Sequence, residues 1–229
     1  MTKQIIPLLF ILSVISCEKE VNSEAKSFEN KTENNIVSKT VQDKEILYSK
    51  FKPDTISDVK IKGFDIESSF SYGSKKFTVG SYISSTGEIT AADTENDYGK
   101  RLLVLNEKDK IIFKGRGSGD SFQYWPKFYR NKSNEKVIIV CQMAFEYFYG
   151  GEVFLLENNS VKYLGTIDLE PFDEETKMTD ILEIYEKNNA IHFKFNSDTL
   201  LLQPGSEDIK IKNNGIEYVY EDSKFTLNR

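Results

Sequence analysis

The stretch KVIIVCQMAFEYFYGGEVFLLE, Lys136 to Glu157, decides the fold. Its first part, Lys136 to Tyr149, is rich in β-branched and aromatic residues, which favour strands. Successive side chains of a strand point to opposite faces, and both sets are apolar here, so we expect a strand that is covered on both faces. Gly150 and Gly151 predict a turn after it, and Glu152 to Glu157 predicts the next strand.

Cys141 lies in the middle of this apolar stretch, which predicts a small core residue rather than a reactive thiol. The chain contains one other cysteine, Cys17. If Cys17 carries lipid, Cys141 has no partner and the protein has no disulfide.

Short apolar segments separated by turns continue through the rest of the chain. We expect strands at Ile46 to Phe51, Phe77 to Ile83, Glu88 to Ala92, Arg101 to Asn106, Lys110 to Gly115, Phe122 to Tyr129 and Val161 to Asp168. Asn214 and Gly215 predict a tight hairpin between the segments DIKIK and IEYVY. The segment PFDEETKMTD, which opens with Pro171, is the one stretch that favours a helical turn.

No long stretch shows the 3.6-residue periodicity of an amphipathic helix. The sequence therefore predicts a mainly β fold of antiparallel meanders and hairpins, arranged as a β-sandwich or an open barrel. Val104 to Gly115 also aligns without gaps with Phe154 to Gly165, a shift of about 50 residues. Because repeats of this length occur in propeller blades, a small propeller-like arrangement is the alternative.

The N-terminus carries a separate signal. Lys3 precedes an apolar run from Ile5 to Ile15, which is shorter than the roughly 20 residues that span a bilayer and suits a secretory signal. Val14, Ile15 and Ser16 then precede Cys17, and this order resembles the lipobox of bacterial lipoproteins. The resemblance implies cleavage after residue 16, acylation of Cys17 and attachment to a membrane of the cell envelope, on the periplasmic face or the cell surface.

The remaining organisation follows from composition. Residues 17–45 are polar and charged, which predicts a flexible tether, and residues 46–229 are long enough for one β-rich domain. The formal net charge of the chain is −6, so we expect no nucleic-acid partner.

Aromatic residues gather around the deciding stretch and give the main candidate for a ligand site. Exposed aromatic rings near loops stack on sugars or anchor a partner protein. The candidate residues are Tyr124, Trp125, Tyr147, Phe148 and Tyr149. The alternative is that alternate rings fill a β core while the others cover a sheet edge.

Two loops suggest ion binding. DTENDYG, Asp93 to Gly99, resembles calcium-binding loops and would ligate through Asp93, Glu95 and Asp97, although Tyr98 stands where a glycine is expected. GRGSGD, Gly115 to Asp120, offers successive backbone amides to an anion. The alternatives are an acidic surface turn and a plain glycine loop. No cofactor other than calcium is indicated.

Catalytic signals are weak. His192 is the single histidine, and no serine-elbow motif accompanies it. Ile191, Phe193 and Phe195 would share the buried face of its strand, which leaves His192 and Lys194 on the wetter face. The sequence therefore names no catalytic residue.

Three functions remain open at this stage. The leading one is a lipid-anchored envelope protein with a binding domain for a glycan or an envelope protein. The alternatives are a glycoside hydrolase-like enzyme with paired carboxylates and a structural lipoprotein without a small ligand. Binding predicts a concave surface that presents Trp125 or Tyr147, catalysis predicts two carboxylates in one pocket, and a structural role predicts neither.

Overall fold

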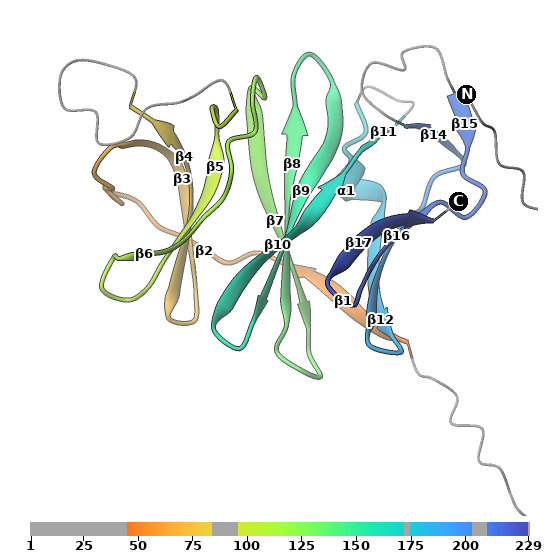
Figure 1. Ribbon diagram of the computed structural model, residues 1–229, viewed down its shortest axis with the longest axis horizontal. Coiled ribbons are helices and arrows are strands. Elements are labelled where there is room, and N and C mark those ends of the chain that lie inside the picture. The colour runs from red at the N-terminus through yellow and green to blue at the C-terminus, as the bar shows by residue number, and fades with distance from the viewer. Residues whose placement is uncertain (1–44, 84–95, 172–174, 203–209, 229) are drawn as a thin grey trace, which may run out of the picture. The chain divides into compact units, whose positions relative to one another are not determined.

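The computed structural model describes residues 45–83, 96–171, 175–202 and 210–228, all of which belong to the C-terminal part of the chain, residues 42–229. Cys17 with its signal and tether, the expected strand Glu88 to Ala92, and Asp93 and Glu95 lie outside these ranges. The described part is mainly β with antiparallel sheets, which confirms the predicted fold class (Figure 1). It contains no helix long and apolar enough to cross a bilayer.

The elements follow one another as strands with one short helix between them. They are β1 (Ile46–Phe51), β2 (Asp54–Thr55), β3 (Phe64–Tyr72), β4 (Lys75–Tyr82), β5 (Arg101–Leu105), β6 (Ile111–Lys114), β7 (Gln123–Asn131), β8 (Val137–Ala144), β9 (Phe148–Glu157), β10 (Ser160–Ile167), β11 (Leu169–Pro171), α1 (Met178–Ile181), β12 (Leu182–Lys187), β13 (Ala190–Phe195), β14 (Thr199–Leu202), β15 (Lys210–Lys212), β16 (Glu217–Glu221) and β17 (Lys224–Asn228).

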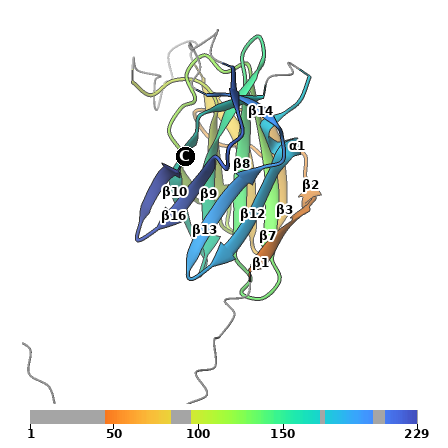
Figure 2. The same ribbon diagram turned by 90° about the vertical axis from the view of Figure 1, so that its right-hand side faces the viewer.

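Nine strands form the largest sheet, in the order β10-β9-β8-β7-β1-β12-β13-β16-β17. The sheet curls so that its two end strands approach each other, and it is nearly a closed barrel; Figure 2 shows β12, β13 and β16 in front of β7, β8 and β9. Phe225 of β17 packs on Gly165 of β10, where a Cβ atom would overlap the ring. Glycine at this β-bulge therefore lets the two edges close.

A five-stranded sheet, β2-β3-β4-β5-β6, covers the outer face of β7, β8 and β9. One hydrophobic core fills the barrel and includes Ile138 and Val140, and a second core lies between the sheets and includes Ile139 and Cys141. Every residue of β8 is buried. The predicted strand covered on both faces and the core position of Cys141 are therefore confirmed, and the fold combines a sandwich with a barrel.

The predicted turn at Gly150 and Gly151 is wrong. The chain turns at residues 145–147, and both glycines lie inside β9. A Cβ on Gly150 would overlap the carbonyl oxygen of Ile167, and one on Gly151 would lie 2.9 Å from Met178 Cε. These glycines therefore permit close packing in the barrel rather than a change of direction.

The predicted hairpin around Asn214 and Gly215 is also wrong. The preceding strand β15 pairs with β14 in a small sheet with β11, whereas β16 pairs with β13 and β17. Asn213 directs this crossing, because its side-chain amide donates to Phe195 O at 2.6 Å while its Oδ1 accepts from Ile216 N. The hairpin partner of β16 is β17, whose turn residues Asp222 and Ser223 both have positive φ.

The one described helix, α1, lies in the segment where a helical turn is predicted, although it begins at Met178 rather than near Pro171. It sits at one end of the barrel, where Met178 belongs to the barrel core. The backbone N–H of Thr179 donates to Oε1 of the buried Gln142, while the amide nitrogen of Gln142 donates to Gly150 O at 2.9 Å. Gln142 therefore fastens the helix to β8 and β9.

Candidate functional site

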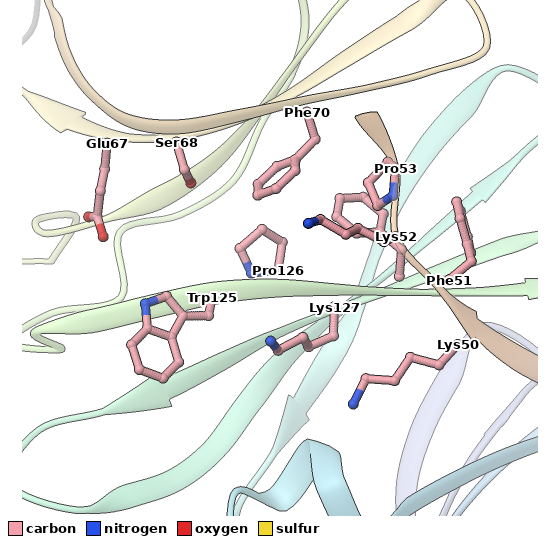
Figure 3. A pocket seen from close by; sticks show the side chains of 11 residues that line it. Lys50, Phe51, Lys52, Pro53, Glu67, Ser68, Phe70, Trp125, Pro126 and Lys127 are labelled. Carbon is pink, nitrogen blue, oxygen red and sulfur yellow. The ribbon is translucent and has the colours of Figure 1, made fainter. Parts of the chain in front are cut away.

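A groove opens where β1 leaves β7. Strand β1 pairs with residues 128–131 of β7, so residues 123–127 keep β8 as their strand partner and have no partner from β1. The groove has a volume of about 650 Å³, and Figure 3 shows the side chains around it. Its lining consists of Lys50, Phe51, Lys52, Pro53, Glu67, Ser68, Phe70, Trp125, Pro126, Lys127 and Phe128. We call it the Trp125 groove.

Alternation along β7 places different groups on the two sides of its free edge. Trp125 and Lys127 share the face that leads to Tyr129 in the barrel core, while Pro126 and Phe128 share the face toward the five-stranded sheet. In Figure 3 the indole ring and the Lys127 side chain lie on one side of the strand, and Pro126 lies on the other, toward Phe70. The groove therefore passes over the edge of β7 from one face to the other.

Lysines surround these apolar rings. Lys50 shares the face of Lys127, because it is paired with Tyr129 across β1 and β7. In Figure 3 the Lys52 side chain reaches toward Pro126 and Phe70. Burial, with the nearby charges of Lys50 and Lys177, lowers the pKa of Lys127 despite the opposing charge of Asp180. The site thus holds several ammonium groups close enough to repel one another.

Carboxylates are few at this site. Among the described residues that line the groove, Glu67 is the one carboxylate, and its Oε2 lies 2.6 Å from Nζ of Lys100. Beside the groove, Oδ1 of Asp180 lies 3.5 Å from Nζ of Lys50. No described carboxylate lies at ion-pair distance from Lys52, Lys127 or Lys177. The part of the chain that the structure describes therefore neutralises these lysines only in part.

Phe148 and Lys177 pack against the ring of Trp125. Its ring lies 5.7 Å from that of Phe148, and Nζ of Lys177 lies over both rings, at 5.6 Å from the Trp125 centroid and 5.2 Å from the Phe148 centroid. The indole is half-buried. Such packing fixes the orientation of the ring while one side of it still faces the groove.

The other aromatic residues of the predicted site lie elsewhere. Tyr124 is fully buried in the core between the sheets, and its hydroxyl donates to the carboxylate of Glu152. Tyr149 is half-buried with its hydroxyl 2.6 Å from Ser121 Oγ, and its ring lies 6.3 Å from that of Tyr147. The structure therefore brings Trp125 and Phe148 together, while Tyr124 is a core residue. Tyr147 lies in the β8–β9 turn and Tyr149 at the start of β9, and neither lines the groove.

The buried carboxyl group of Glu152 is the partner of Tyr124. Burial raises its pKa, and the Tyr124 hydroxyl and the charges of Arg101 and Arg116 act in the opposite direction. Glu152 is opposite Cys141 on β8, whose thiol is fully buried and has its pKa raised by that burial. Tyr124, Cys141 and Glu152 do not line the groove, and their polar groups face one another inside the core.

The two loops proposed for ions pack against each other. Oδ1 of Asp97 accepts from Gly117 N at 2.7 Å and from Arg101 Nη1 at 2.9 Å, while Arg116 donates to Asn96 O. A Cβ on Gly117 would overlap the carbonyl oxygen of Tyr98. We call Asp97, Arg101, Arg116 and Gly117 the arginine cluster. The Gly117 amide and both guanidinium groups donate to acceptors of the chain.

The calcium prediction stays a prediction, because Asp93 and Glu95 lie outside the described residues. Within the described ranges, no group of three or more His, Cys, Asp or Glu side chains is placed to hold a metal. Burial would raise the pKa of Asp97, but the Gly117 amide and the Arg101 charge outweigh it and lower that pKa.

His192 lies on the outer face of the barrel, away from the groove. Its ring stacks on Tyr185 with centroids 4.6 Å apart, and Nδ1 lies 3.2 Å from Oε1 of Glu217. Ile191, Phe193 and Phe195 are buried in the barrel core, as the alternation of this strand predicts.

The lysines of the groove are the residues that sequence reasoning missed. Lys50 and Lys52 lie about 75 residues from Lys127, and the two segments meet only because β1 pairs with β7. A signal was present in YSKFKP and WPKF, where lysines stand beside aromatic and proline residues, but it does not indicate that the segments are neighbours.

No family model matches the chain, and the comparisons with curated proteins and with solved structures likewise find no match. The candidate site therefore rests on the geometry of this chain.

Proposed function

We propose that this protein is a lipid-anchored protein of the bacterial cell envelope whose β domain binds a glycan in the Trp125 groove. The observation that carries the binding function is a concave surface that presents a half-buried tryptophan with further apolar rings beside it. The volume of about 650 Å³ lies within the range of small-molecule and oligomer sites. The C–H face of a sugar ring packs well on an indole ring of fixed orientation.

A glycan suits the groove better than a peptide strand. A peptide that adds to a sheet edge needs backbone donors along that edge. Pro126 lies in the part of β7 without a β1 partner, and a proline has no N–H to donate. Pro126 therefore contributes no backbone donor, and its ring lines the groove instead, which favours a ligand that presents ring faces and polar substituents to side chains.

The groove also favours binding over glycoside hydrolysis. Hydrolysis needs two carboxyl groups on opposite sides of the scissile bond. In the described lining Glu67 is the one carboxylate, and it is paired with Lys100. The described lining thus supplies apolar rings and cations that can hold a ligand, and it contains one carboxylate where hydrolysis needs two.

Replacement of Trp125 tests the binding site. We expect Trp125→Ala to weaken glycan capture by at least about tenfold, because a central ring of fixed orientation is lost. Phe122→Ala is the matched control: this ring is 63% exposed and stacks on Phe145, but does not line the groove. Glycan-array binding of both variants and the unaltered chain gives the measurement. Equal glycan capture by Trp125→Ala and the unaltered chain contradicts the proposed site. If capture is lost only with Phe122→Ala, the binding site is the Phe122–Phe145 stack instead.

The anchor is tested independently. Each buried CH₂ of an acyl chain contributes about 0.8 kcal/mol of membrane affinity, and stable attachment takes more than one chain. We therefore expect Cys17→Ser to move the protein from the membrane fraction to the soluble fraction. Unchanged partitioning of this variant contradicts the anchor and leaves the groove untouched.

A further inference from the structure

The charge of the Trp125 groove differs in sign from that of the chain. Among the described residues, five lysines line or border it, and the carboxylates that pair with them there are Glu67 and Asp180. These lysines are Lys50, Lys52, Lys100, Lys127 and Lys177. The chain as a whole has a formal net charge of −6. A positive groove in an acidic protein is complementary to an anion that enters the groove.

The ammonium groups lie on both sides of the free β7 edge. Lys127 and Lys50 accompany Trp125 on one face, while Lys52 reaches toward Pro126 and Phe70 on the other. A ligand with one anionic group would engage one of these sides. A chain that crosses the edge and carries an anionic group on successive units would engage both.

We propose that the ligand is an acidic polysaccharide, with a carboxylate on its sugar rings, that lies across the β7 edge. This inference rests on the glycan-binding function proposed above and names the class of glycan. One sugar ring packs on Trp125 with its carboxylate at Lys127 and Lys50, and a neighbouring ring packs on Pro126 and Phe70 with its carboxylate at Lys52. An entering carboxylate also offsets the burial and the repulsion from Lys50 and Lys177 that together lower the pKa of Lys127.

A nucleic acid is the other polyanion with flat rings. Its phosphates would extend beyond the groove on to the surface of a chain that carries more acidic than basic residues. The observations therefore favour the saccharide, and an oligonucleotide serves as an arm of the test.

The test compares polygalacturonate with its fully methyl-esterified form, within a glycan array that holds further acidic and neutral saccharides and single-stranded oligothymidylate. The methyl ester keeps the sugar backbone and removes the charge. The proteins are the unaltered full chain, Lys127→Met, Lys52→Met and the control Lys108→Met, whose exposed side chain lies outside the groove lining. Thermal unfolding of each variant checks that it is folded.

We expect the unaltered chain to bind acidic saccharides at least about tenfold more tightly than their neutral forms, because each carboxylate gains charge-assisted hydrogen bonds. Lys127→Met and Lys52→Met should each lose about tenfold in affinity for the acidic form, and Lys108→Met should lose little. Increasing salt from about 50 mM to about 500 mM should weaken capture of the acidic form.

Each other outcome has a definite consequence. Equal affinity for acidic and neutral saccharides overturns the acidic ligand and leaves the proposed glycan-binding function standing. Capture of no saccharide overturns both. An equal loss with Lys108→Met and Lys127→Met overturns the groove as the place of charge recognition, and tighter capture of oligothymidylate than of any saccharide overturns the ligand class.

Discussion

The arginine cluster and the Trp125 groove differ in whether their charged side chains are paired within the described part of the chain. In the cluster, Arg101 has a fully buried side chain, donates to Asp97 and stacks over the Tyr82 ring at 4.0 Å. In the groove, Lys52 and Lys127 have no described carboxylate at ion-pair distance. Buried charges that are paired within the chain serve the fold, because their partners are already in place. Lys127 is half-buried and Lys52 is exposed, and a charge at a groove without such a partner is available to a ligand from outside.

The largest expected effect is a loss of stability in the cluster. Gly117→Ala places a methyl group on the carbonyl oxygen of Tyr98, so we expect a loss of more than about 3 kcal/mol in the free energy of unfolding. Gly73→Ala is the control: its φ of +59° is strained for alanine, but no atom lies within 4 Å, so about 1 kcal/mol is expected. Urea unfolding followed by circular dichroism measures both, and similar losses at the two sites would contradict the tight packing of the two loops.

Loss of the carboxylate of Asp97 should cost somewhat less. Asp97→Ala removes a carboxylate that pairs with the buried guanidinium of Arg101, which we expect to cost about 2–3 kcal/mol of stability. The folded variant should bind the acidic saccharide as the unaltered chain does, because Asp97 does not line the groove. A large loss of affinity in the folded variant would break the distinction between the two regions.

The same carboxylate gives the cluster a pH dependence. Its pKa in the folded protein lies below the ordinary 3.8, so its stabilisation is present above that pH and is lost as the pH falls through the lowered pKa. We expect the unaltered chain to lose more stability than Asp97→Ala between about pH 5 and pH 2. Denaturant midpoints across this range test the difference, and parallel curves would show that Asp97 is not paired in solution.

The smallest effect has the opposite sign. Lys127→Met removes a partly buried charge that Lys50 and Lys177 repel, while it keeps most of the apolar stem. We expect an increase of about 0.5 kcal/mol in the free energy of unfolding, together with the loss of affinity described above. A loss of stability in this variant would show that Lys127 serves the fold and would remove the contrast with the cluster.

Local patterns in the sequence predict the strands well where burial follows the two-residue period. The fully buried β8 and the alternation of Ile191, Phe193 and Phe195 are read directly from residue types. The roles of Gly150 and Gly151 are different, because they depend on Ile167 and Met178, which approach only in the folded barrel. In the sequence, two adjacent glycines that form a turn cannot be distinguished from two that permit a close contact.

The site was predictable only in part for a related reason. Trp125 stands out as the one tryptophan of the chain, and Phe148 lies beside it as part of the predicted aromatic cluster. The groove itself depends on β1 pairing with half of β7 and then leaving it, which brings Lys50 and Lys52 to Lys127. Strand pairing between distant segments is not encoded in the spacing of residues along either one.

The most direct test of the account is to couple the ligand to the protein covalently. A carbodiimide joins a carboxylate to a nearby lysine amine as an amide with loss of water, so trigalacturonate bound in the groove should be found by peptide mass spectrometry on Lys127, Lys50 or Lys52. We expect coupling at these lysines and its suppression in Trp125→Ala. Coupling concentrated on exposed hairpin lysines such as Lys108, unchanged in Trp125→Ala, would contradict it.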